Sequence, residues 1–201
     1  MSPRKSAAEA HRTRERIVER SVAVASVEGL QGLTIGRLAT DLGISKSGLL
    51  GHFGTKEILQ LAALRHASEV FSRAVWEPAS DTEPGLARLR AVCEAWTTYL
   101  DRERVTFPGG CLFTTSAVEF DARTPGRVRD AVVKLHQVWR HRLLGDIRHA
   151  VVSGELPPAT DPDQLVFELT GIFLSLNHTV QLFGDTTAPD RTRRAVERLL
   201  G

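Results

Sequence analysis

The sequence predicts an all-α protein of about nine helices, in which a three-helix head precedes a larger helical body. Two observations on its 201 residues lead to this prediction. Alanine, leucine, arginine and valine are abundant, tyrosine occurs once, and alternating valine-rich strands are absent. Apolar residues instead recur at helical spacing, i, i+3, i+4 and i+7, in stretches that Gly- and Pro-containing loops separate.

A helix-turn-helix layout is predicted close to the N-terminus. Thr34 stands where an N-cap residue belongs, Gly43 ends a first short helix, and Ser45 caps a second. Leu49 and Phe53 lie four residues apart in the second helix, which lets them dock on the first. The first helix offers an apolar face at Ile35, Leu38, Ala39 and Leu42. The alternative is an ordinary helical hairpin with a capped loop.

From Thr13 to Leu59 the chain resembles, without a gap, the DNA-binding domain of the TetR-type bacterial transcriptional repressors. The matching positions include Thr13, Ile17, Gly29, Thr34, Ile35, Leu38, Ala39, Gly43, Ser45, Lys46, Leu49, His52, Phe53, Lys56 and Glu57. The chain departs from that family at Gly48, where Thr is usual, at Leu50, where Tyr is usual, and at Gly51. The usual Tyr–phosphate contact is therefore not expected here.

The second short helix is the expected recognition helix, because the N-terminal end of such a helix reads base edges and its free amides meet phosphates. Lys46, His52 and Lys56 are expected to contact the DNA backbone, and Leu50 to pack on a thymine methyl group. The complete predicted DNA-binding set is Thr34, Ser45, Lys46, Ser47, Gly48, Leu50, Gly51, His52 and Lys56. The predicted partner is a double-stranded DNA operator.

The distribution of charge agrees with a nucleic-acid partner. Residues 1–56 carry nine Lys and Arg against five Asp and Glu, which gives +4 and leaves −2 of the total +2 for the rest of the chain. Arg4 and Lys5, in a tail over residues 1–10 that is predicted to be flexible, could add phosphate contacts.

The sequence offers no motif of a catalytic, metal or cofactor site, so we expect none of these and no enzymatic activity. Its seven histidines lack any recognisable ligand spacing, and no Walker loop, G-x-S-x-G elbow or dinucleotide fingerprint occurs. The N-terminus is polar, and the most apolar segment, Leu165–Leu176, is too short to cross a bilayer. A cytoplasmic protein without a membrane partner is expected.

The helices are predicted at Glu9–Glu28, the two short helices above, Thr55–Trp76, Leu86–Leu100, Cys111–Phe120, Val128–Val152, Pro162–Phe183 and Pro189–Leu200. We expect a DNA-binding domain over residues 1–54 and a ligand-binding and dimerisation domain over residues 55–201. Because the helix Pro162–Phe183 is apolar nearly all round, it should pack inside the subunit on one side and against a second copy on the other. The predicted homodimer interface is Leu169, Ile172, Leu176, Val180, Phe183, Val196 and Leu199.

The resemblance implies a transcriptional repressor that a small molecule releases from a palindromic operator by binding the helical body. Candidate ligand-binding residues are Cys93, Trp96, Tyr99, Phe113, His136, Trp139 and Asn177. This set is largely apolar and has no Arg or Lys pair, which predicts a neutral, mostly apolar effector. The alternatives are a regulator switched by the thiols of Cys93 and Cys111, a DNA-binding regulator without a ligand, and a helical enzyme that carries the same head.

Overall fold

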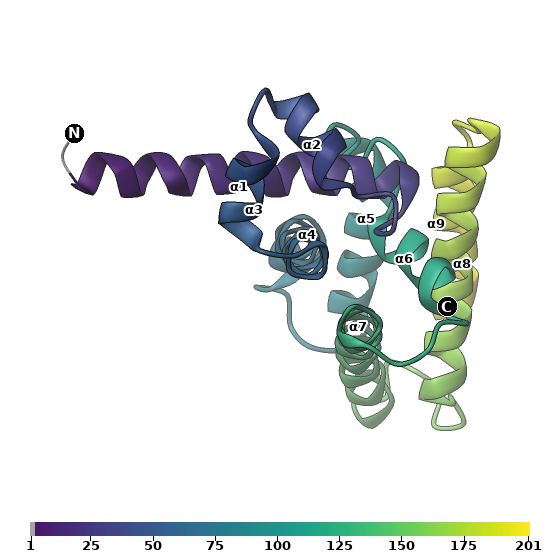
Figure 1. Ribbon diagram of the computed structural model, residues 1–201. Helices are drawn as coiled ribbons and strands as arrows, with labels where there is room; N and C mark the ends of the chain where they lie inside the picture. The colour runs from purple at the N-terminus through teal and green to yellow at the C-terminus, as the bar shows by residue number, and fades with distance from the viewer. Residues whose placement is uncertain (1–2) are drawn as a thin grey trace. The chain divides into compact units, whose positions relative to one another are not determined.

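The computed structural model describes residues 3–201, with side chains from residue 7 onward, and these residues form helices, turns and loops without a strand. The α-helices are α1 Pro3–Glu28, α2 Ile35–Leu42, α3 Lys46–Phe53, α4 Lys56–Phe71, α5 Leu86–Arg102, α6 Leu112–Phe120, α7 Arg127–Val152, α8 Pro162–Phe183 and α9 Ala188–Leu200 (Figure 1). The predicted all-α class is confirmed. Among the described helices, none is both long and apolar enough to cross a membrane.

The chain packs into two compact units. The first unit holds the residues up to Ser68 together with Arg104–Val132, and the second holds Glu69–Glu103 together with Val133–Gly201. Helices α4 and α7 each begin in the first unit and end in the second. The functional division at residue 54 stays a prediction.

Two predicted elements need correction. The sequence predicts a flexible tail up to residue 10, but α1 begins at Pro3, since Ala7, Ala8 and Ala10 favour a helix. The side chains of Arg4 and Lys5 lie outside the described residues.

The predicted helix Thr55–Trp76 is also not uniform. Its α-helical part ends at Phe71, and a π-helical turn, Ser72–Trp76, follows, closed by the bond from the Glu77 N–H to the Ser72 carbonyl. A short 3-10 turn with Pro78 then ends the segment. Proline lacks the N–H that would continue an α-helix, which explains the stop.

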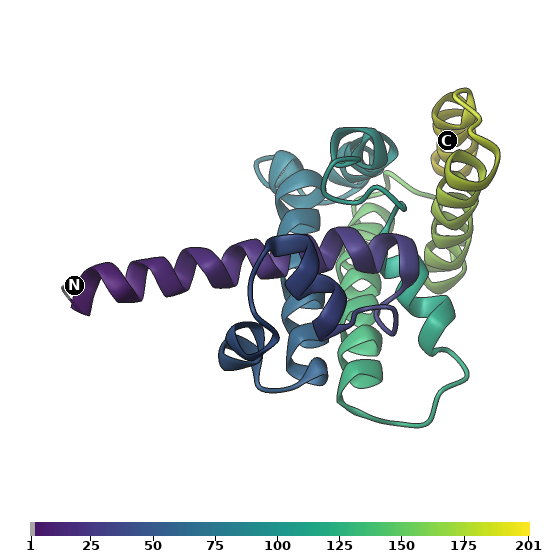
Figure 2. The same ribbon diagram turned by 45° about the horizontal axis from the view of Figure 1, so that its top comes forward.

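Helices α8 and α9 lie side by side in the second unit (Figures 1 and 2). Asp161 caps α8 by accepting from the N–H groups of Asp163 and Gln164, and Gly184 ends it at φ 62°, as the sequence predicted. The buried side of α8 consists of Leu165, Val166, Leu169, Phe173 and Leu176.

Candidate DNA-binding and effector sites

Helices α2 and α3 form the predicted helix-turn-helix in the first unit. The Thr34 hydroxyl accepts from the Arg37 N–H at 3.2 Å and caps α2. Gly43 then turns the chain at φ 65°. This left-handed conformation is unfavourable for any residue that has a Cβ atom. The Ser45 hydroxyl accepts from the Gly48 N–H at 2.9 Å and caps α3. Both caps stand where the sequence placed them.

Helix α3 has one buried and one exposed face. Leu49 and Phe53 are buried where α3 packs on α2. Leu50, although apolar, keeps 40% of its surface exposed. Of the predicted DNA-binding set, Thr34, Ser45, Lys46, Ser47, Gly48, Leu50 and Gly51 are exposed, and His52 and Lys56 are half-buried. The exposed face therefore combines hydroxyl groups, one lysine and glycines that leave the backbone open.

Arg14 of α1 fixes the C-terminal end of α3, a role that the sequence did not reveal. Its Nη1 donates to the His52 carbonyl, and its guanidinium carbon lies 4.1 Å from the centre of the Phe53 ring. A cation at the last carbonyls complements the negative end of the helix dipole. The two residues of the hydrogen bond are 38 positions apart, and no local pattern links them.

The turn between α1 and α2 is held by side chains from two other helices of the first unit. The Glu119 carboxylate of α6 accepts from the N–H groups of Leu30 and Gln31, at 2.7 Å each. From α4, Gln60 donates to the Leu30 carbonyl at 2.8 Å, and the Lys56 ammonium donates to the Gln31 carbonyl at 2.5 Å. Lys56 therefore uses one of its three donors inside the protein.

Two basic side chains in this region, Arg20 and Arg37, form ion pairs between α1 and α2. Arg20 Nη2 lies 2.7 Å from Asp41 Oδ2, and Arg37 pairs with Glu28. These side chains are 23–42% exposed, so each pair contributes at most about 1 kcal/mol. Their role is to orient α2 against α1, whereas Lys46 stands exposed at the first turn of α3.

The second unit holds an aromatic cluster: Phe71, Trp76, Trp96, Tyr99, Trp139 and Phe173. The Trp96 ring stacks on Phe173 with 3.6 Å between ring centres and meets the edge of Trp139 at 4.1 Å. Trp76 lies 4.9 Å from Trp139, and Phe71 lies 5.2 Å from both Trp139 and Tyr99. The cluster contains all three tryptophans of the chain.

Three of the predicted effector residues lie together in the second unit. Trp96, Tyr99 and Trp139 join the aromatic cluster, while Phe113 belongs to the first unit. His136 and Asn177 are half-buried in the second unit. The sequence missed Phe71, Trp76 and Phe173 as cluster members, because the π-helical turn and the buried side of α8 that place them carry no distinct pattern.

The cysteines have the properties of core residues. Cys93 is buried in the second unit and Cys111 in the first, and both are free thiols. Burial raises the pKa of Cys93 to about 12, and burial also raises the pKa of Cys111. Because the thiolate is the reactive form, both thiols are poor redox sensors, and the thiol-switched alternative is not favoured.

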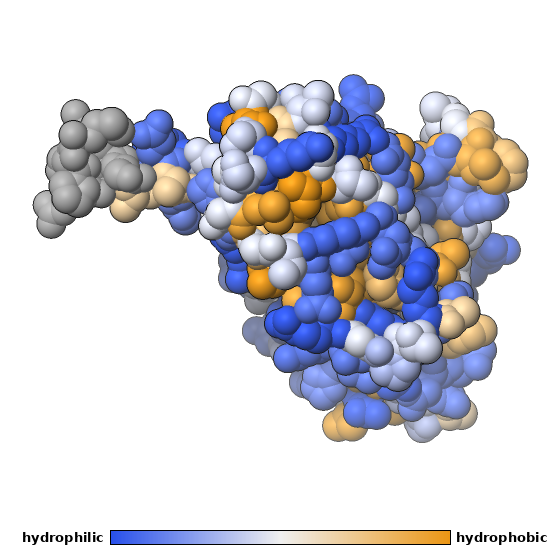
Figure 3. Space-filling view, in the orientation of Figure 1, coloured by the Kyte–Doolittle hydropathy of each residue, from blue (hydrophilic) through white to orange (hydrophobic). Residues whose placement is uncertain are grey.

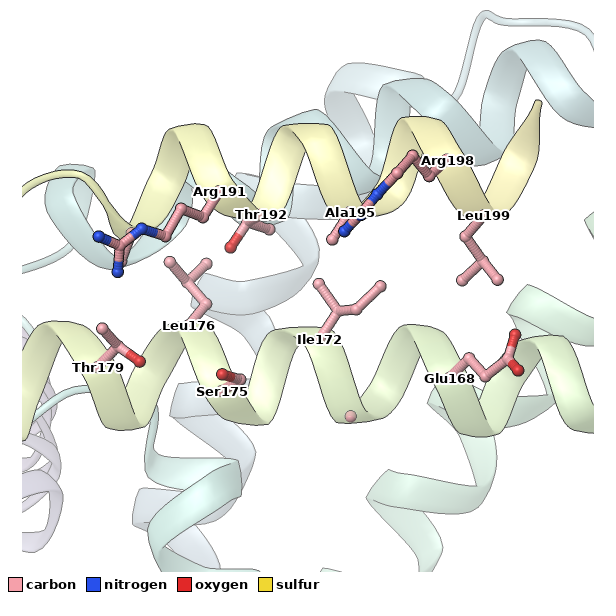
Figure 4. A pocket seen from close by; sticks show the side chains of 12 residues that line it. Glu168, Ile172, Ser175, Leu176, Thr179, Arg191, Thr192, Ala195, Arg198 and Leu199 are labelled. Atoms are coloured by element: carbon pink, nitrogen blue, oxygen red, sulfur yellow. The ribbon is translucent and has the colours of Figure 1, made fainter.

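A groove of about 750 Å³ runs between α8 and α9 (Figure 4). Ile172 and Leu176 of α8 point toward α9 across it, and Arg191 and Arg198 of α9 stand along its other side. Gly171, Ser175 and Ala195 also line it, and their small side chains leave space.

The predicted dimer residues divide into buried and accessible ones. Leu169, Leu176 and Val196 are at most 7% exposed within the subunit, so their side chains have almost no surface left for a partner. The place of these three residues in the dimer interface stays a prediction. Ile172, Val180 and Leu199 are half-buried, and Phe183 is 68% exposed. Three other apolar residues of α8, which the predicted interface set does not include, are exposed: Phe167, Leu174 and Leu182.

Within the described residues, no group of three or more His, Cys, Asp and Glu side chains is placed to hold a metal ion.

Comparison with known proteins gives consistent matches. Residues 85–196 match the family model described as tetracyclin repressor-like, C-terminal domain. Over 201 residues the chain is 25% identical to the HTH-type transcriptional regulator SrpR of Pseudomonas putida, covering 98% of this chain and 86% of that protein.

Two solved structures are similar in fold. A TetR transcriptional regulator from Chloroflexus aurantiacus superposes with a TM-score of 0.83 at 23% identity, covering 96% of this chain and 94% of that one. AibR, solved in complex with isovaleryl coenzyme A and operator DNA, superposes with a TM-score of 0.71 at 18% identity, covering 91% of this chain and 95% of that one.

Proposed function

The chain belongs to the TetR family of transcriptional regulators, and from this premise we propose that it is a homodimeric repressor that a small neutral molecule releases from its operator. As a member of this family it is a DNA-binding regulator of transcription. In this proposal α3 enters the major groove, and the second unit supplies the partner and effector sites. Binding of an operator would take place in the bacterial cytoplasm.

The main support for a DNA-reading role is the exposed face of α3. Hydroxyl groups at Ser45 and Ser47 can bond to base edges or phosphates, and Leu50 offers an apolar contact for a thymine methyl group. Arg14 and the bonded turn at Leu30–Gln31 hold this face in place. Selection of bound duplexes from a random pool would test the role. A two-fold palindrome should emerge, and recovery of unrelated sequences would contradict it.

Lys46→Ala should weaken binding to all duplexes about equally and lower the salt slope of log K by about one unit, because one phosphate contact is lost. A salt titration of operator affinity measures both quantities, with a scrambled duplex for comparison. An unchanged slope would remove Lys46 from the contact set.

Gly51→Ala should stabilise the protein by up to about 1 kcal/mol yet weaken operator binding. A Cβ atom at Gly51 meets nothing within 4 Å, and alanine is the better helix former. On the DNA, the same methyl group would occupy the space that lets the backbone approach closely. Thermal melts and operator titrations measure the two effects.

Gly145→Ala is the matched control for this substitution, since Gly145 is exposed in α7 and a Cβ atom there also meets nothing within 4 Å. It should raise stability by a similar amount and leave DNA binding unchanged. Equal operator affinity of Gly51→Ala and the parent protein would place Gly51 away from the DNA.

The proposed dimer uses the accessible side of α8 together with the α8–α9 groove. Phe167, Gly171, Leu174, His178 and Leu182 are exposed and follow one another at spacings of four, three, four and four residues. This spacing is typical of a helix seam in a coiled coil or bundle. Figure 3 shows hydrophobic surface on the α8–α9 pair, at the right-hand edge. If the seam of one copy packs against the groove of the other, the dimer covers both the seam and the groove.

The effector proposal rests on the aromatic cluster. Its rings offer a large apolar surface, and Trp96, Trp139 and Phe173 come from three different helices of the second unit. A neutral, mostly apolar molecule fits such surroundings, whereas a phosphate would require a pair of basic side chains. To release the operator, the effector must bind the DNA-incompetent form more tightly, by about 1–3 kcal/mol of coupling.

A further inference from the structure

The indole nitrogen of Trp139 is a buried donor that has no hydrogen-bond partner among the described residues. The rings of Phe71, Trp76 and Trp96 surround its indole, and none of them carries an acceptor oxygen. Buried polar groups are nearly always paired, and leaving a donor unpaired costs free energy. A ligand that brings an acceptor to this nitrogen recovers that cost.

We infer that the effector is a planar, neutral aromatic molecule that takes the place of Trp76 beside Trp139 and accepts a hydrogen bond from Trp139 Nε1. This inference rests on the proposed function, in which an effector binds the second unit. It specifies the chemistry of that effector and the residue that anchors it.

Trp76 is the ring to be displaced because its position depends on the π-helical turn. On a regular α-helix, residues five apart lie roughly 140° apart around the axis, so Phe71 and Trp76 could not both face Trp139. The i→i+5 bond from the Glu77 N–H to the Ser72 carbonyl brings both rings to it, at 5.2 and 4.9 Å. Such turns are rare and concentrate at functional sites.

Displacement of Trp76 would also reach the DNA-binding element through the chain itself. Once Trp76 leaves Trp139, the contact between the two rings no longer stabilises the π-helical turn Ser72–Trp76. The turn can then adopt α-helical geometry. This turn extends α4, whose first residue, Lys56, follows the recognition helix after a two-residue connection. A change of geometry at one end of α4 therefore acts on the segment that carries α3.

The surroundings of Trp76 define the ligand. The Trp76 ring lies 4.9 Å from Trp139 between ring centres, tilted by 58°, so the space that Trp76 would vacate suits one flat ring system. The Arg142 guanidinium carbon lies 4.9 Å from the centre of the Trp76 ring. A ligand in the same place meets this cation, which attracts an electron-rich ring face and repels a positive charge. The effector class is thus neutral, flat and equipped with an acceptor.

Three bicyclic probes of nearly the same shape test the inference on the full-length protein. Naphthalene has no acceptor, quinoline has a ring nitrogen that accepts, and N-methylquinolinium is cationic and cannot accept. Equilibrium dialysis gives their dissociation constants for the parent protein, Trp139→Phe and Trp76→Ala, with circular dichroism melts to show that each variant is folded. The ratio of the quinoline to the naphthalene constant cancels the different hydrophobicity of the two probes.

The expected result is that Trp139→Phe raises this ratio by about fivefold or more, since only quinoline loses a hydrogen bond. Trp76→Ala should bind both neutral probes more tightly than the parent, because no ring has to leave. N-methylquinolinium should bind more than about tenfold more weakly than quinoline. An unchanged ratio in Trp139→Phe, or weaker binding of both neutral probes by folded Trp76→Ala, would overturn the inference.

Titration of selected operator DNA in the same samples separates this inference from the proposed function. Quinoline should lower the operator affinity of the parent protein, and Trp139→Phe should reduce that effect. If other ligands release the operator equally well from the parent and from Trp139→Phe, only the role of Trp139 as the anchor is overturned. A protein that binds no operator from the random pool would instead contradict the proposed function.

Discussion

Leu174→Glu is expected to convert the dimer to a monomer and to lower operator affinity by about 10²- to 10⁴-fold. Leu174 lies in the middle of the exposed seam on α8 and is 43% exposed in the single chain. A carboxylate there stays hydrated in the monomer, but it would be buried without a partner in the dimer. Loss of the second recognition helix removes the high effective concentration that links the two half-sites, which accounts for the size of the effect.

Light scattering gives the mass of the variant, and titration of the selected palindrome gives its affinity. Val138→Glu is the matched control, because Val138 is apolar, 45% exposed and situated in α7 outside the proposed seam. This control should remain dimeric with unchanged affinity. A Leu174→Glu protein that stays dimeric, or a monomer that binds the palindrome as tightly as the parent, would rule out the proposed interface.

The choice of Leu174 shows what the structure adds to the sequence. The sequence favoured Leu176 as an interface residue, but Leu176 is only 3% exposed in the single chain. A charge at Leu176 would be buried in the core, and its effect on the dimer could not be distinguished from unfolding. When a helix is apolar nearly all round, its pattern does not tell which side faces the core. Only the packing against other helices decides this.

The elements that the sequence predicted best are those with local signals. The caps at Thr34 and Ser45 and the glycine turn at Gly43 depend on residue type within one helical turn, and all three occur where the sequence placed them. The limits of α8 are also local, since Asp161 and Gly184 end it on either side. These signals were sufficient for the helix-turn-helix and for most helix ends.

The features that the sequence did not reveal are contacts between residues far apart in the chain. Glu119 holds the amides of Leu30 and Gln31 across 89 and 88 positions, and a carboxylate in a short helix gives no sign of this. The sequence predicts plain helix over Ser72–Trp76, because residue type there does not distinguish a π-helical turn from an α-helix. Residue type predicts Trp96 and Trp139 at an effector site, but their shared cluster with Trp76 depends on that turn.

Arg88→Ala is expected to lower the free energy of unfolding by about 3 kcal/mol, although the Arg88 side chain is 31% exposed. Asp146 of α7 is only 2% exposed, and Arg88 of α5 lies 2.6 Å from it through Nη2 and 2.9 Å through Nε. The remaining bond to the carboxylate comes from the Gly85 N–H at 3.3 Å. Without Arg88, a buried negative charge would lose its counter-charge.

Two controls make the cause identifiable in thermal or denaturant unfolding. Arg90→Ala, on the same helix, breaks an exposed pair with Glu197 and should cost less than about 1 kcal/mol. The double variant Arg88→Met with Asp146→Leu should regain most of the loss, because a buried pair can be replaced by apolar side chains at little cost. If the double variant is no more stable than Arg88→Ala, the loss comes from packing rather than from the unpaired charge.

The Arg88–Asp146 pair also joins the two helices that carry Trp96 and Trp139, α5 and α7. Loosening it should therefore let the aromatic cluster open without a ligand. Since the cluster contains all three tryptophans, the change should appear as a shift of tryptophan fluorescence in Arg88→Ala, below its unfolding temperature, and not in Arg90→Ala. Destabilisation without this shift would mean that the pair supports the fold but does not hold the cluster closed.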